Sequence, residues 1–228
     1  ALGFGFYADR VHRQRAAIAY LEARGDLAYY PHTYQSSIPA DTWLNRFYRS
    51  DWWAEIVYVG LTGDAEEPLE AADFANLTNL RHVRALEIVA NPDTPLPDAT
   101  AFAKLRSLSE LRSLSLRWDE VPPAVIREIA QLEQLEILRV DASINDACLR
   151  ELARLPALTR LDISTLSLTP EGLLHLAACP KLENLKLYGP LWLTEDDCQK
   201  FLEARPDVEV RWPLMIDSRG PQPQPIAP

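Results

Sequence analysis

The pattern that decides the fold is L-x-x-L-x-x-L-x-L, which is written in full three times: Leu108-Ser-Glu-Leu111-Arg-Ser-Leu114-Ser-Leu116, Leu132-Glu-Gln-Leu135-Glu-Ile-Leu138-Arg-Val140 and Leu155-Pro-Ala-Leu158-Thr-Arg-Leu161-Asp-Ile163. Frames with conservative changes precede and follow these, and a partial frame ends at Val210. The third apolar position of successive frames falls at residues 59, 86, 114, 138, 161, 185 and 208, in steps of 27, 28, 24, 23, 24 and 23. A period of about 20 to 29 residues indicates a solenoid of stacked units.

Each unit joins a short strand to a helix. The L-x-L end of each frame alternates apolar and polar residues, which predicts a strand with its leucines turned inward. Helix starts follow at Asn145, at Thr169-Pro170 and at Thr194, which has Asp197 three residues later. One strand and one helix cannot bury their apolar sides alone, so consecutive units must stack. We therefore expect an α/β fold: a right-handed arc with a parallel sheet on the concave face and helices on the convex face.

The chain divides into three parts on this reading. Residues 1–52 form an N-terminal stub and helical cap, residues 53–212 form six to seven repeat units, and residues 213–228 form a Pro-rich tail. Within the cap we expect a helix over 11–23, a strand over 27–30 and a short helix over 41–48. Because a solenoid exposes an apolar end unless it is covered, three tryptophans are interpreted as plugs of that end. They are Trp43, Trp52 and Trp53.

Composition excludes several classes of function. The net charge of −10 makes nucleic acid an unlikely partner, because phosphate binding needs a clustered basic surface. The three cysteines, Cys148, Cys179 and Cys198, lack metal-ligand spacing and are interpreted as small core residues. Cysteines that form no disulfide framework suit a reducing, cytoplasmic location. No sequence motif for catalysis, a cofactor or a metal is present, so we expect a non-enzymatic protein. Leucine accounts for 35 residues, 28 of them between Leu77 and Leu202.

The start of the sequence leaves two interpretations open. Residues 1–7 are apolar, and basic residues follow from Arg10 to Arg15. Seven residues cannot span a bilayer, which needs about 20. They are either the end of a membrane helix that lies upstream of Ala1, which would place this domain in the cytoplasm, or a frayed hydrophobic terminus.

The units resemble those of bacterial leucine-rich repeat proteins of the ribonuclease-inhibitor-like or cysteine-containing type. The resemblance is carried by LEQLEILRVDASINDACLRELARL over 132–155 and by turns resembling the family's LTDAGL at Ile144–Leu149 and Leu168–Leu173. It covers roughly residues 53–212 and implies the solenoid fold. Members of the family bind many different proteins, and a membrane helix often precedes the cap in such bacterial proteins. The resemblance therefore implies a protein partner and is consistent with an anchor.

The inner face of the arc carries the candidate binding residues. The residue between the two apolar strand positions is, unit by unit, Gly60, Glu87, Ser115, Arg139, Asp162, Lys186 and Glu209. The last four alternate in sign and should be neighbours about 4.8 Å apart. Such a row is either a self-satisfied charge ladder or part of a binding patch. Adding the Tyr and Arg residues of the flanking columns, which are enriched at interface hot spots, gives the candidate set: Tyr58, Glu87, Arg117, Arg139, Arg160, Asp162, Lys186, Tyr188 and Arg211. Trp118 and Trp192 follow strands and are either exposed at the edge or packed on a neighbouring unit.

Three hypotheses of function follow. The first is a non-enzymatic scaffold that binds a protein partner through the concave face. The second is a membrane-anchored structural module of a larger assembly. The third is the substrate-recognition arm of an enzyme complex.

Overall fold

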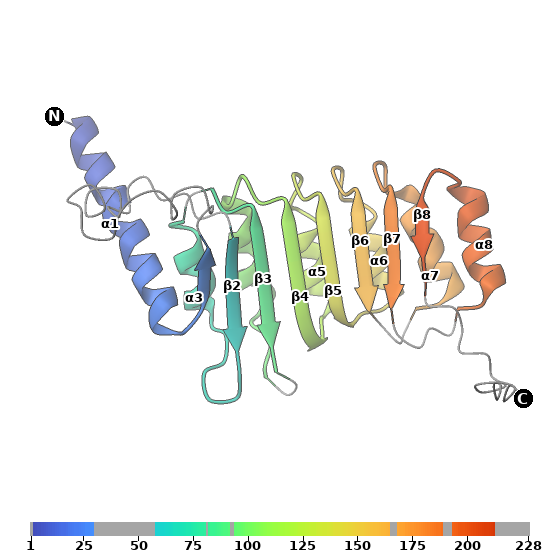
Figure 1. Ribbon diagram of the computed structural model, residues 1–228, viewed down its shortest axis with the longest axis horizontal. Coiled ribbons are helices and arrows are strands. Elements are labelled where there is room, and N and C mark those ends of the chain that lie inside the picture. Colours follow the sequence, from blue (N-terminus) through green and yellow to red (C-terminus); the bar gives the residue numbers. More distant parts are fainter. Residues whose placement is uncertain are drawn as a thin grey trace, which may run out of the picture.

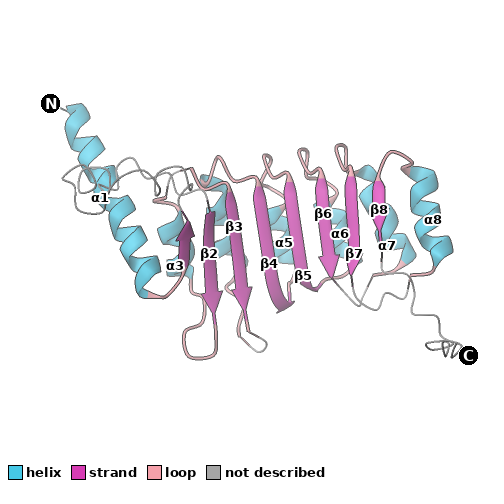
Figure 2. Ribbon diagram, viewed as in Figure 1, coloured by secondary structure: helices cyan, strands magenta, loops and turns pink. Residues whose placement is uncertain are grey.

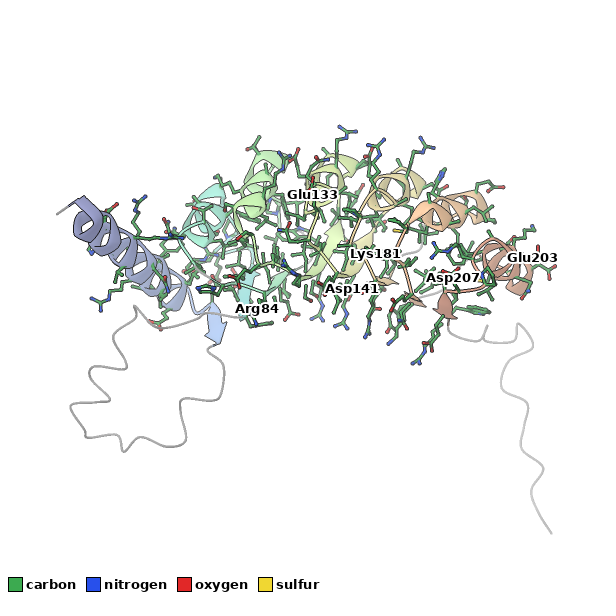
Figure 3. All side chains as sticks on the ribbon, turned by 90° about the horizontal axis from the view of Figure 1, so that it is seen from above. Arg84, Glu133, Asp141, Lys181, Glu203 and Asp207 are labelled. Carbon is green, nitrogen blue, oxygen red and sulfur yellow. The ribbon has the colours of Figure 1, made fainter. Side chains whose placement is uncertain are left out.

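The computed structural model describes residues 2–29, 58–80, 82–91, 94–164, 168–188 and 193–212. They form a single sheet whose strands lie side by side in sequence order, β1 to β8, with helices along one face (Figure 1). Strand β1 runs antiparallel to β2, and β2 to β8 are all parallel. Seen from above, the row of helices bows outward over the sheet (Figure 3). The predicted α/β solenoid is confirmed.

Strands and helices alternate along the chain (Figure 2). The strands are β1 (Leu27–Tyr29), β2 (Tyr58–Gly63), β3 (Ala85–Ala90), β4 (Ser113–Glu120), β5 (Ile137–Ser143), β6 (Arg160–Ser164), β7 (Asn184–Tyr188) and β8 (Glu209–Arg211). The helices are α1 (Leu2–Ala23), α3 (Ala71–Leu77), α4 (Ala99–Ala103), α5 (Pro123–Ile129), α6 (Asp146–Leu152), α7 (Pro170–His175) and α8 (Glu195–Ala204), with the 3-10 turns η2 (Lys104–Ser107) and η3 (Leu176–Ala178).

The leucines of the repeat form continuous rows through the sheet. In the first row Val59, Leu86, Leu114, Leu138, Leu161 and Leu185 are paired strand to strand, and each is at most 1% exposed. A second row runs from Leu61 to Leu187 and is equally buried. Because side chains alternate across a strand, both rows point toward the helices, and the polar residues between them lie on the opposite face.

The predicted helix starts are observed. The side chain of Asn145 accepts a hydrogen bond from Cys148 N (3.2 Å), and that of Thr169 accepts one from Gly172 N (3.1 Å). Thr194 and Asp197 form a reciprocal capping box. Such caps satisfy backbone N–H groups that have no partner within the helix. They therefore allow helices of only six or seven residues, such as α6 and α7, to begin at fixed points against the sheet.

The N-terminal end of the sheet is covered by α1 and β1. Helix α1 begins at Leu2, nine residues before the start expected at Val11, and buries Ile18 and Leu21. Two buried carboxylates, Asp26 and Asp73, lie beneath it and share Arg24, whose guanidinium atoms lie 3.4 Å and 3.3 Å from them. Tyr20 donates its hydroxyl to Asp73 at 2.8 Å, so this polar cluster ties α1 to α3. No helix within the described ranges is both long and apolar enough to cross a membrane.

The register of the last unit differs from the prediction. Val210, and not Val208, pairs with Leu185, so Lys186 faces Arg211 and Glu209 faces Asn184. The predicted Lys186–Glu209 neighbours are therefore wrong. Val208, 3% exposed, corresponds to Leu182, because each stands two residues after a proline, Pro206 and Pro180. The last unit has one residue fewer between this position and its strand, which explains the shifted register.

Several expectations fall on other parts of the chain. The helix over 41–48, Trp43, Trp52, Trp53, Trp192 and the tail over 213–228 lie outside the described residues. Trp118 is described and is packed: it is 6% exposed, and its indole N–H donates to the Thr94 carbonyl at 2.9 Å.

Candidate protein-binding face

The candidate face is the side of the sheet that lies opposite the helices. No described helix crosses this side (Figures 1 and 3), and Asp141, labelled in Figure 3, points away from the helices. All nine predicted contact residues belong to strands β2 to β8 and occupy the column between the buried rows or the two columns that flank them. The structure places them on one continuous surface, except that Arg211 stands next to Lys186 instead of Tyr188.

The centre of the face is a cluster of two arginines on one carboxylate. Arg160 donates to Asp162 through Nε (3.0 Å to Oδ1) and Nη2 (2.9 Å to Oδ2). Arg139, on the neighbouring strand, reaches the same Oδ2 at 3.4 Å. The Asp162 side chain is 2% exposed, whereas those of Arg139 and Arg160 are 56% and 36% exposed. The predicted Arg139–Asp162 neighbours are confirmed.

The arginines hold Asp162 in its charged form. Burial by itself raises the pKa of a carboxyl group, because the charged form loses water. Here the hydrogen bonds from Arg160 and Arg139, together with the nearby charges of Arg160 and Lys186, outweigh burial, and the pKa of Asp162 is lowered. The pKa of Arg160 is raised, chiefly by its hydrogen bond to Asp162. The cluster therefore stays ionised near neutral pH.

Other charges of the face are paired one to one. Arg117 lies 3.4 Å from Asp141, and both side chains are at least half exposed (61% and 50%). Arg211 donates to Glu209 on its own strand at 2.8 Å. Tyr58 donates its hydroxyl to Glu87 across the β2–β3 pair. The two exposed ion pairs, Arg117–Asp141 and Arg211–Glu209, each contribute only about 0.2–1 kcal/mol to stability.

Two large side chains add apolar surface. Tyr188 is 45% exposed at the end of β7, and Ile137 is 39% exposed at the start of β5. Ile137 pairs in register with Arg160, and it was not among the predicted contacts. Its position could have identified it, because all residues of one column lie on the same face of the sheet, whatever their residue type.

A second pattern was also available in the sequence but was not used. Arg160-Leu-Asp162 places a cation and an anion two residues apart on one strand, and therefore on one face. The same reasoning applies to Glu209-Val-Arg211. Pairing along a strand thus competes with the pairing across strands on which the prediction was based.

Neither the cysteines nor the acidic residues form a metal site within the described ranges. No group of three or more His, Cys, Asp or Glu side chains there is placed to hold an ion. Cys148, Cys179 and Cys198 are buried in the core and are not joined in disulfides. Burial raises the pKa of Cys148 and raises that of Cys179 to about 11, which keeps these thiols protonated and unreactive at neutral pH.

The sequence and the fold were compared with known proteins. No protein-family model matches the sequence, and no curated protein matches it. Among solved structures, a leucine-rich repeat protein of Leptospira interrogans is similar, with 18% sequence identity and a TM-score of 0.40 over 60% of this chain. The chain covers 33% of that protein, about a third of its length.

The class of protein follows from the molecule itself. Seven parallel strands stack in register, their leucines form continuous buried rows, and a helix lies on the outer side of nearly every unit. This is the architecture of a leucine-rich repeat solenoid.

Proposed function

We propose that this protein is a non-enzymatic scaffold that binds a protein partner through the open face of its sheet. One observation carries the proposal: helices cover one face of the sheet, while the other presents polar and charged columns together with the exposed side chains of Tyr188 and Ile137. Extended concave faces of this kind are the binding surfaces of solenoid proteins. Tyr and Arg are the residue types enriched at the energetic centres of interfaces.

The composition of the face suits a protein partner, either a folded domain or an extended segment. Charged pairs such as Arg117–Asp141 are exposed and individually weak, so a partner can exchange them at small cost. Tyr188 supplies a large amphipathic contact surface beside them. The buried cysteines, which are not joined in disulfides, are consistent with a cytoplasmic location, which forms part of the proposal.

Site-specific photo-cross-linking tests the proposal. A photoreactive benzoylphenylalanine replaces Tyr188 on the open face or, as a matched control, Leu174 on α7; these side chains are 45% and 39% exposed. In native extract we expect a discrete adduct from position 188 and none from position 174. Excess unlabelled protein should compete for that adduct, whereas a variant carrying Arg117→Ala, Arg160→Ala and Tyr188→Ala should not. The same adduct from both positions, or equal competition by the variant, would contradict the proposal.

A further inference from the structure

The central cluster of the open face carries more positive than negative charge. Arg139, Arg160 and Lys186 lie on three consecutive strands around one carboxylate, that of Asp162. Asp162 and Lys186 are direct neighbours in register. No carboxylate in the described part of the chain lies within 4 Å of the Lys186 amine. Three cations and one anion leave a surplus of about two positive charges at the middle of the sheet.

The surplus is local. The flanking cations Arg117 and Arg211 each have a carboxylate of their own, at 3.4 Å and 2.6 Å. Two further acids of this face, Asp141 and Glu87, are engaged with Arg117 and Tyr58. The whole protein has a net charge of −10. A positive centre in an acidic molecule is therefore a distinct feature of this face.

The side chains of the cluster are also preorganised, that is, oriented before any ligand binds. The buried Asp162 fixes Arg160 by two hydrogen bonds and holds Arg139 by one, so both guanidinium groups are oriented without a partner. A guanidinium has five N–H donors. Donors therefore remain on both side chains, which are 56% and 36% exposed. Preorganised donors of this kind reduce the entropy lost when a ligand binds.

We propose that Arg139, Arg160 and Lys186 form an anchoring site for a carboxylate side chain of an acidic partner segment. The proposal rests on the scaffold function above and specifies the chemistry of its partner. Ile137, beside Arg160 in register, and Tyr188, two residues after Lys186, flank the anchor and suit apolar side chains next to that carboxylate. A surplus of about two charges matches one or two carboxylates, whereas nucleic-acid binding relies on an extended basic surface that contacts many phosphates.

A peptide titration tests the anchor directly. The ¹⁵N-labelled full chain is titrated at low salt with acetylated, amidated hexaglutamate, and NMR shifts are followed at the backbone and at arginine Nε–H groups. We expect the largest shifts at Arg139, Arg160 and Lys186. Neutral hexaglutamine and a six-nucleotide thymidine oligomer serve as comparison probes and should bind more weakly than hexaglutamate.

Variants then assign the effect to the cluster. Arg139→Gln and Lys186→Gln leave Arg160 bonded to Asp162, so the fold is retained. Each should weaken hexaglutamate binding about twofold to fivefold, and both together about tenfold, the range of single exposed charge contacts. Arg127→Gln, on helix α5 and 60% exposed in the wild type, should change it less than twofold.

Three results would overturn the inference: equal losses in Arg127→Gln and Lys186→Gln, shifts spread over the helices, or tighter binding of the oligonucleotide at the same site. These results are distinct from failure of the scaffold function. If the position-188 adduct still forms and still depends on the open face, the scaffold remains and only the acidic character of the partner is wrong.

Discussion

Gly172 in α7 occupies a place that a side chain cannot share with Asp146 of the preceding unit. A Cβ on Gly172 would meet Asp146 Oδ1 at 1.9 Å and Cγ at 2.3 Å. That carboxylate accepts hydrogen bonds from Thr169 N (3.1 Å) and Oγ1 (2.6 Å), which join α6 to the start of α7. Gly172→Ala must therefore displace Asp146 and break this link between units.

The relative sizes of two energy terms decide whether Gly172→Ala stabilises or destabilises the fold. Alanine in a helix is favoured over glycine by about 1 kcal/mol, whereas hydrogen bonds to a charged group contribute about 1.5–3 kcal/mol each. We expect Gly172→Ala to lower the free energy of unfolding by about 1–3 kcal/mol in urea denaturation. In an Asp146→Ala background the contacts with Oδ1 and Cγ are absent and only the Cβ contact at 2.9 Å remains, so the same change should cost clearly less. Equal destabilisation in both backgrounds would show that Asp146 is not the cause.

Asp162 gives a prediction that depends on pH. Its pKa is lowered in the folded protein, so its charged form stabilises the fold at any pH above the unfolded value, about 3.9. That contribution is lost as the pH falls through the lowered folded value. We expect Asp162→Asn to cost about 1–2 kcal/mol at pH 7, and the difference from wild type to shrink steadily below about pH 4.

The control for this prediction is Asp141→Asn. Asp141 is 50% exposed and pairs only at 3.4 Å, so its removal should cost less than about 1 kcal/mol. Urea denaturation between pH 2.5 and 7 measures both variants. A difference between Asp162→Asn and wild type that does not change with pH would contradict the role assigned to the charge.

At the scale of elements, Arg205 links the last described unit of the solenoid to the unit before it. It follows α8 and stands before Pro206 as Cys179 stands before Pro180 in the preceding unit. Its guanidinium donates to the carbonyls of Ala177 (3.2 Å), Cys179 (2.6 Å) and Leu182 (2.9 Å). These carbonyls belong to the turn of the preceding unit, so one side chain ties the last unit to it.

We expect Arg205→Ala to loosen this end of the molecule selectively. Amide hydrogen exchange in α8 and β8 should become about tenfold faster or more, while exchange in β2 to β5 should change little, because repeat proteins open locally. Asp207→Asn removes the other partner of Arg205 but leaves the three carbonyl bonds. It should therefore have a smaller effect. An equal effect of the two substitutions would mean that the ion pair, and not the carbonyl bonds, holds the end.

The strands and helices show which parts of the fold could be predicted from the sequence. The L-x-L pairs placed β2 to β7 in the correct register, because a buried apolar row tolerates no slip. The last unit was misplaced by two residues, since Val208 and Val210 are both apolar and a slip of two leaves each on the same face. The start of α1 was missed because Gly3 and Gly5 are weak helix formers and give no sequence signal of a helix start.

The candidate site was predicted in composition but not in its contacts. Alternation alone placed Arg139 beside Asp162. It could not show that Arg160 takes most of the hydrogen bonds of that carboxylate, because side-chain conformations decide between pairing along a strand and across strands. The burial of Asp162 was likewise invisible in the sequence, since the other polar side chains of its column are half-buried or exposed.

At the scale of the whole molecule, each unit touches only its neighbours. The carbonyl of Arg112 accepts N–H bonds from Glu136 and Ile137, and that of Glu136 accepts them from Thr159 and Arg160 of the next unit. The same pattern recurs at the carbonyls of Arg84 and Thr159, and a single bond from Glu209 N to Glu183 O continues it, while the strands of the described sheet pair only with their neighbours. Stability is then close to a sum of unit and nearest-neighbour terms.

This coupling predicts that position along the stack governs how far a defect spreads. Leu138 is fully buried in β5, with units on both sides, whereas Val210 lies in the last strand. Leu138→Ala should cost about 2–5 kcal/mol and raise hydrogen exchange in the units on both sides, because both lose a packed neighbour. Val210→Ala should cost less and raise exchange only in α8, β7 and β8. If Val210→Ala instead raised exchange as far as β2, the units would unfold as one body, and the additive description of this solenoid would be wrong.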